Sequence, residues 1–159
     1  MQIRDAEAKD AVAACEVMRR SIAELCLVDH RNDPAILQRW LENKTPEFFM
    51  SWLKQPDNSL LVAVEDGRIL AVGSVTDAGR ITLNYVSPDA RFRGVSRGML
   101  DALEVRAAEM GNSRCVLTST ETARRFYQAR GYMEDGPAVG EFGTTAGYPM
   151  TKLLRSHQS

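Results

Sequence analysis

The chain has 159 residues, of which 44% are hydrophobic and 26% are charged, as is usual for a soluble domain with its own core. A formal net charge of −1 gives no electrostatic reason to expect a nucleic-acid or membrane partner. No apolar run could span a membrane, and the polar start, Met1–Asp10, is not typical of a signal peptide. We therefore expect a single domain over residues 1–159, located in the cytoplasm.

The cysteines Cys15, Cys26 and Cys115 are odd in number and lack the spacing of metal ligands. We expect them to be small buried residues in a reducing compartment, and we expect no metal.

The first third of the sequence predicts helices. A helical pattern of apolar residues extends from about Lys9 to Cys26. Asp33-Pro34 and Thr45-Pro46 each predict an N-cap followed by proline at the first helical position. They open two short predicted helices, Pro34 to Glu42 and Pro46 to Lys54.

The rest of the sequence predicts strands interspersed with two helices. The turns at Asp66-Gly67 and Ala78-Gly79 separate apolar runs typical of antiparallel strands. This order predicts an α/β or α+β domain built on a mixed sheet. The predicted strands are Leu60–Val64, Ile69–Thr76, Ile81–Val86, Cys115–Ser119, Val139–Phe142 and Tyr148–Leu154, and the helices are Val95–Met110 and Thr122–Ala129.

The most informative segment is the basic loop between the strand that ends at Val86 and the helix that starts at Val95. The N–H groups of a helix N-terminus have no partner within the helix, so they can hold an anion. Gly94 allows close approach to the backbone, and three arginines add positive charge. The loop therefore indicates phosphate binding, although it contains neither a P-loop nor a dinucleotide motif. Taken alone, a solvated basic turn explains it equally well. The arginines are Arg91, Arg93 and Arg97.

Together with the rest of the chain, this loop resembles the acyl-CoA-binding motif of the GNAT N-acetyltransferase superfamily, Arg/Gln-x-x-Gly-x-Gly/Ala. That pattern falls on Arg91-Phe92-Arg93-Gly94-Val95-Ser96, with serine at the last small position. The segment from Ala123 to Tyr132 resembles the family's Ala-x-x-Phe-Tyr-x-x-x-Gly-Phe/Tyr helix, preceded by Thr120 where asparagine is usual. Ile3 to Asp10 and Met150 to Leu153 look like the opening strand with its first helix, and the closing strand.

The resemblance implies a mostly antiparallel central sheet flanked by helices, with the fourth and fifth strands splayed apart. It implies acetyl-CoA as cosubstrate, with its pantetheine arm in the gap and its pyrophosphate on the loop amides. It also implies direct attack by an amine, with Tyr127 as the acid that protonates the leaving thiolate. The implied cofactor-binding residues are Asn84, Tyr85, Val86, Arg91, Phe92, Arg93, Gly94, Val95, Ser96, Arg97 and Thr120.

The sequence does not identify a general base, because neither strand beside the gap carries a carboxylate there. The candidates are an ordered water or a residue of the first loop: Glu24, Asp29 or His30. A solvent-exposed loop position is the more natural expectation for His30. The aromatic residues of the first third are expected to be core or dimer contacts, or one could wall the acceptor pocket. They are Trp40, Phe48, Phe49 and Trp52, and Tyr85 fits either the core or that pocket.

The expected function is acetylation of a primary amine, with a small molecule favoured as acceptor. A catalytically silent acyl-CoA sensor with the same fold remains an alternative, as does an enzyme that acts on a protein amine. Acetylation of aminoacyl-tRNA is disfavoured by the net charge, and an unrelated nucleotide-binding module by the missing phosphate motifs. A homodimer is compatible with these expectations.

Overall fold

The computed structural model describes residues 1–140 and 147–155. Its elements follow the predicted order of helices, antiparallel strands, helix, strand, helix and strands. They are β1 (Gln2–Asp5), α1 (Ala11–Leu25), α2 (Leu27–His30), α3 (Pro34–Leu41), α4 (Pro46–Lys54), β2 (Asn58–Glu65), β3 (Arg68–Thr76), β4 (Ile81–Val86), α5 (Val95–Glu109), β5 (Arg114–Ser119), α6 (Arg124–Ala129), β6 (Met133–Glu134) and β7 (Tyr148–Leu153).

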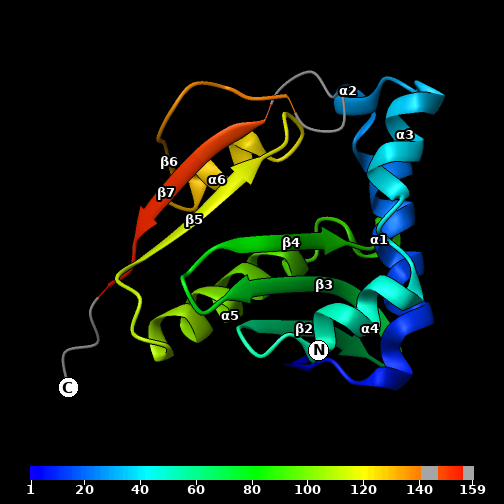
Figure 1. Ribbon diagram of the computed structural model, residues 1–159, viewed down its shortest axis with the longest axis horizontal. Helices are drawn as coiled ribbons and strands as arrows, with labels where there is room; N and C mark the ends of the chain where they lie inside the picture. Colours follow the sequence, from blue (N-terminus) through cyan, green and yellow to red (C-terminus); the bar gives the residue numbers. More distant parts are fainter. Residues whose placement is uncertain (141–146, 156–159) are drawn as a thin grey trace.

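The strands form two antiparallel sheets, ordered β1-β2-β3-β4 and β5-β7-β6. Among the described residues one β-bridge joins the sheets, a parallel pairing of Arg80 with Val116. The Val116 amide donates there to the Gly79 carbonyl at 3.0 Å. Beyond this bridge β4 and β5 diverge toward α1 and α2 (Figure 1). The predicted splay of the fourth and fifth strands is therefore confirmed.

Both faces of the first sheet are buried, and the strand period of two decides what each side chain meets. On β2, Leu60 and Val62 pack in the cluster formed with α1 and α4. Leu61 and Ala63 point the other way, into the cluster formed with α5. The sheet is thus the middle layer between helices, and β4 at its edge forms one side of the gap.

A glycine of β3 sets how closely α5 can approach the sheet. A Cβ built at Gly73 would lie 2.7 Å from the Met99 sulfur and 3.0 Å from a Leu103 methyl. Real Cβ atoms essentially never lie as close as 2.7 Å to another atom, so a larger residue at this position would require the Met99 side chain to shift. Gly73 is also the β-ladder partner of Asn84 on β4, so this close packing lies directly beside the gap.

The predicted helix caps and the predicted hairpin are confirmed, but the structure also contains short elements that the sequence did not predict. Asp33 and Thr45 accept hydrogen bonds from N–H groups of the helices that they precede. The sequence did not predict α2 or β6, since one helical turn or two strand residues carry no periodic pattern. Of the strand predicted over Val139–Phe142, Val139 makes an isolated bridge with Gly147, and residues 141–142 lie outside the described residues. No helix in the described ranges is long and apolar enough to cross a membrane.

Candidate active site

A cavity of about 460 Å³ lies where β4 and β5 separate, and we call it the gap cavity. Residues of α1, β4, the β4–α5 loop, the start of α5, β5 and α6 line it. All but one of the predicted site residues lie on its wall. Those present are Asn84, Tyr85, Val86, Arg91, Phe92, Gly94, Val95, Ser96, Arg97, Thr120 and Tyr127.

The N-terminus of α5 opens into the gap cavity. Gly94 is its N-cap, with φ of 78°, a left-handed conformation that glycine adopts without strain. No side chain caps the helix, and its first turn contains no acidic residue. The first-turn amides are therefore available to an anion from the cavity, and the helix dipole favours negative charge there.

Arg93 is the predicted site residue that does not line the cavity. Its guanidinium pairs with Glu65 at the end of β2, at 2.5 Å. The positive charge expected from this arginine is thus already neutralised by a carboxylate. Phe92 beside it is 92% exposed at φ of 62°, and the Arg91 guanidinium lies 4.6 Å from its ring centroid.

Tyr127 of α6 also lines the gap cavity. Only 7% of the residue is exposed, and its ring packs edge-on against Phe126 and Tyr132. Its hydroxyl oxygen accepts a hydrogen bond from the Asn84 side-chain amide at 3.0 Å. Burial raises the pKa of Tyr127 to about 12, partly offset by that hydrogen bond. The hydroxyl therefore remains protonated at neutral pH and can donate.

A second cavity, of about 410 Å³, adjoins the first, and we call it the aromatic cavity. The two share residues of β4 and β5, including Thr82, Tyr85 and Thr118, and they share Thr120 of the loop after β5. The Trp40 indole N–H donates to the Tyr85 hydroxyl at 3.1 Å. The described residues that line this cavity include one cation, Lys44, and no carboxylate. They are Trp40, Asn43, Lys44, Trp52, Gln55, Asn58, Ser74, Thr76, Thr82, Leu83, Tyr85, Thr118, Ser119, Thr120 and Gly147.

This arrangement shows which of the aromatic residues belong to the core and which line a cavity. Trp40 and Phe49 are buried, Phe48 is 46% exposed, and Trp52 contributes to the wall of the aromatic cavity together with Trp40. Tyr85 lines both cavities and also packs against the core.

None of the three candidate bases faces either cavity. The expectation that His30 is a solvent-exposed loop residue is wrong, because its side chain is fully buried at the end of α2. One ring nitrogen lies 2.8 Å from the Ile22 carbonyl oxygen, and the other accepts from the Asn32 amide. Glu24 is half exposed and pairs with Arg20 at 2.9 Å.

Asp29 is also fully buried, and it links α2 to the loop between β5 and α6. Its carboxylate accepts from the Glu121 amide at 2.7 Å and from the Thr122 amide at 3.2 Å, and it also accepts from the Thr122 hydroxyl. That loop carries Thr120 and Thr122, which line the gap cavity. Asp29 therefore supports the cavity wall. The sequence does not reveal this role, because its partners lie 92 and 93 positions away.

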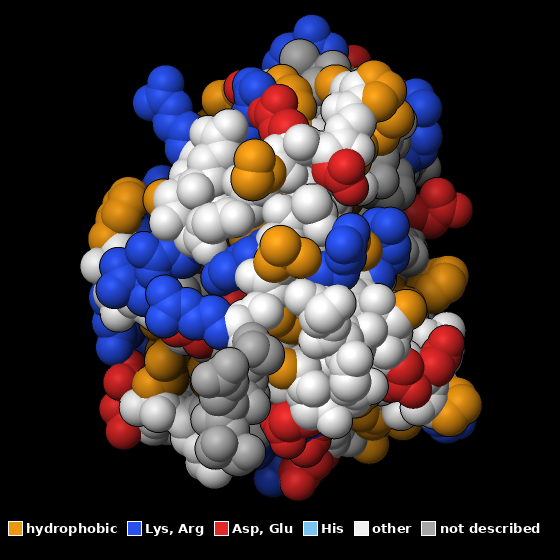
Figure 2. Space-filling model, turned by 90° about the vertical axis from the view of Figure 1, so that its left-hand side faces the viewer, with side chains coloured by type: hydrophobic (Ala, Val, Ile, Leu, Met, Phe, Trp, Pro, Cys, Tyr) orange, Lys and Arg blue, Asp and Glu red, His pale blue; other side chains and the backbone are white. Residues whose placement is uncertain are grey.

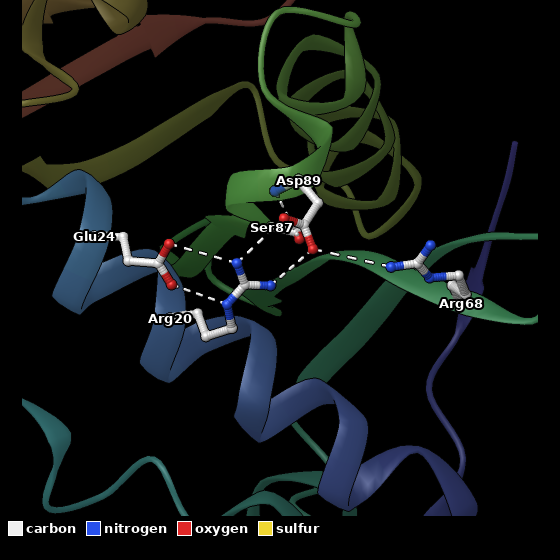
Figure 3. Close-up of polar contacts among 5 residues, drawn as sticks. All are labelled: Arg20, Glu24, Arg68, Ser87 and Asp89. Atoms are coloured by element: carbon white, nitrogen blue, oxygen red, sulfur yellow. Dashed lines mark hydrogen bonds and ion pairs between the residues drawn. The ribbon is translucent and has the colours of Figure 1, made fainter.

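An ion-pair group ties α1 to the loop that precedes α5 (Figure 3). Arg20 bonds to Glu24 on its own helix and to Asp89, at 2.8 Å between Nη1 and Oδ2. Asp89 also lies 3.9 Å from Arg68, and its amide donates to the Ser87 hydroxyl. The start of the basic loop is thus held from two sides, although each of these charges is partly exposed to solvent.

Comparison with known proteins identifies the family to which this geometry corresponds. Residues 27–154 match a family model described as an acetyltransferase (GNAT) domain. No curated protein matches the sequence.

Solved structures with the same fold cover nearly the whole chain. A GCN5-related N-acetyltransferase from Rhodopseudomonas palustris, also named a class-II aminotransferase, is 25% identical with a TM-score of 0.85, over 96% of this chain and 95% of that one. The PaiA N-acetyltransferase of Thermoplasma acidophilum, in complex with coenzyme A, is 16% identical with a TM-score of 0.82, over 96% and 98%. A ribosomal-protein-alanine N-acetyltransferase from Brucella melitensis is 22% identical with a TM-score of 0.72, over 97% and 100%.

Proposed function

The chain belongs to the GNAT family and is an acetyl-CoA-dependent N-acetyltransferase, and we propose that its acceptor is the primary amine of a small molecule. The observation that carries the proposal is the pair of adjoining cavities at the β4–β5 gap. The gap cavity contains an uncapped helix N-terminus and a buried tyrosine hydroxyl. The aromatic cavity is a separate pocket that opens onto the same strands.

The gap cavity has features that suit acetyl-CoA. We assign the pyrophosphate to the amides from Phe92 to Arg97, where no protein carboxylate competes in the first turn of α5. We assign the pantetheine arm to β4, whose far edge is not paired with β5 beyond the bridge at Arg80. Backbone groups of Asn84, Tyr85 and Val86 on that edge can pair with its amides, and one N–H can polarise the thioester carbonyl.

The chemistry requires one bond to form and one to break. The neutral amine attacks the thioester carbon, so that a C–N bond forms and the C–S bond breaks. The sulfur leaves as a thiolate and accepts the hydroxyl hydrogen bond, or the proton, of Tyr127. The amine nitrogen loses a proton to water, because none of the candidate carboxylates or histidines reaches the cavities.

The aromatic cavity favours a small acceptor over a macromolecule. About 410 Å³ is within the range of small-molecule sites. A nucleic-acid acceptor would favour a continuous basic surface, whereas on the face in Figure 2 acidic side chains lie above and below the basic ones. The formal charge of −1 argues in the same direction.

The direct test is release of CoA thiol from acetyl-CoA in the presence of a panel of amines. The panel contains amino acids, polyamines, aminoglycosides and a peptide with an N-terminal alanine, and mass spectrometry identifies the acetylated product. We expect thiol release to depend on at least one small amine and to match product formation. Activity with the peptide alone would assign a protein acceptor. Acetyl-CoA binding without any transfer would instead leave a sensor domain.

A further inference from the structure

Across the gap, a side chain of the first sheet forms a hydrogen bond with Tyr127, the proposed acid. Asn84 is on β4, and Tyr127 is on α6, which follows β5. The Asn84 amide nitrogen donates to the Tyr127 hydroxyl oxygen at 3.0 Å. Both residues line the gap cavity, so this contact lies on the wall where the thioester is proposed to bind.

The direction of this hydrogen bond fixes where the tyrosine proton can go. A phenolic hydroxyl has one proton to donate and can also accept. Because the oxygen accepts from Asn84, the O–H cannot point at that amide nitrogen. Within residues 1–140 and 147–155 the hydroxyl has no hydrogen-bond partner besides Asn84. The hydroxyl proton therefore points away from Asn84, and no described protein group accepts a hydrogen bond from it.

We propose that Asn84 is a positioning residue whose side-chain amide orients the Tyr127 hydroxyl so that its proton faces the leaving sulfur. This inference rests on the proposed function and goes beyond the backbone role assigned to Asn84 above. Burial of Tyr127 keeps the hydroxyl protonated, and the Asn84 amide determines its direction. The two contributions are separate, since one comes from the packing of α6 and the other from β4.

The test compares three replacements of Asn84 in single-turnover acetyl transfer with the best amine of the panel. Asn84→Leu removes the donor at similar volume, and the rate should fall about three- to tenfold, the effect of one hydrogen bond. The carboxylate in Asn84→Asp offers only acceptors. It should accept a hydrogen bond from the Tyr127 hydroxyl, turn that O–H away from the sulfur and lower the rate further. Asn84→Ser retains a hydroxyl donor in a smaller side chain and serves if the leucine variant does not fold. Its rate should lie between those of the wild type and the leucine variant.

The Tyr127→Phe background distinguishes positioning from a general structural role. There is no hydroxyl left to orient, so Asn84→Leu should cost no additional rate in that background. Acetyl-CoA affinity, measured by calorimetry, should remain within about twofold of the wild type. Asn112→Leu is the matched control, because Asn112 makes two side-chain bonds to carbonyls of Asp77 and Ala107 at a distance from the cavity. It should leave the transfer rate unchanged.

Three results would overturn the inference while the proposed function stands. The first is a wild-type rate in Asn84→Leu. The second is an equal loss in both backgrounds, and the third is an aspartate variant as fast as the wild type. If the wild-type protein binds acetyl-CoA but transfers to no amine, the proposed function itself fails.

Discussion

The two cavities at the β4–β5 gap are built in different ways. Much of the gap cavity comes from one continuous stretch, in which a strand, a loop and a helix start follow each other from Asn84 to Arg97. The aromatic cavity takes one or a few residues from each of several elements, among them α3, α4, β3, β4 and β5. The anion-binding end of the gap cavity is thus a local feature of the backbone, whereas the aromatic cavity depends throughout on segments that are distant in the sequence.

This difference indicates which properties are tied to the fold and which are free to vary. A helix N-terminus binds an anion through backbone amides, which every residue except proline provides. The aromatic cavity offers side chains, and a few substitutions would change its shape and polarity without affecting the sheet. On the proposed assignment, variants in the first turn of α5 should mainly affect acetyl-CoA, and variants that line only the aromatic cavity should mainly affect the acceptor.

The largest expected effect is on the rate of acetyl transfer and not on the binding of either ligand. Tyr127→Phe retains the ring and its packing against Phe126 and Tyr132 and deletes only the hydroxyl. General acid catalysis contributes roughly 10²–10⁴-fold, so the single-turnover rate should fall by about 10²-fold or more. Affinity for acetyl-CoA and the acceptor KM should barely change. With the pKa of Tyr127 raised to about 12, the wild-type hydroxyl should not ionise below about pH 11. A wild-type single-turnover rate in the variant would remove Tyr127 from the mechanism.

The second effect should be confined to the gap cavity. Gly94→Glu places bulk and negative charge at the N-cap of α5, where we assign the pyrophosphate. Affinity for acetyl-CoA, measured by calorimetry, should fall at least about tenfold, or ~1.4 kcal/mol. Gly111→Glu is the matched control, because Gly111 also has a positive φ, of 91°, but follows the other end of the same helix. Equal affinity losses in the two variants would indicate backbone strain rather than a lost anion site.

The sequence was most informative where function depends on the local backbone. The loop from Arg91 to Ser96 and the turn at Asp66-Gly67 could be predicted because their glycines and caps act on immediate neighbours. The carboxylate of Asp29 could not be assigned, since its partners lie 92 and 93 residues away. The burial of His30 could not be predicted for the same reason, because burial depends on how α2 packs and not on the polarity of the surrounding sequence.

Asp29 gives a third prediction, which concerns a part of the wall that the two cavities share. Asp29→Asn retains the volume but loses the charge that strengthens the bonds from Glu121 and Thr122. The free energy of unfolding in urea should fall by about 1–3 kcal/mol. Acetyl-CoA affinity should fall and the acceptor KM should rise, because the supported loop contributes Thr120 to both cavities. Asp33→Asn is the control, since asparagine caps a helix about as well as aspartate. Unchanged stability in Asp29→Asn would show that the buried carboxylate is not a support.

The smallest effect should be confined to the aromatic cavity. Trp40→Phe removes the indole N–H that donates to the Tyr85 hydroxyl at 3.1 Å, and it leaves additional space in the wall. We expect the acceptor KM to rise about three- to tenfold, the effect of one hydrogen bond, with acetyl-CoA affinity unchanged. Tyr85→Phe deletes the other partner of the same bond, so the double variant should raise KM little more than either single variant. Because Tyr85 lines both cavities, its single variant can also affect acetyl-CoA, whereas Trp40 lines only one. If Trp40→Phe weakened acetyl-CoA and left the acceptor KM unchanged, the amine would have to enter from another side of the gap.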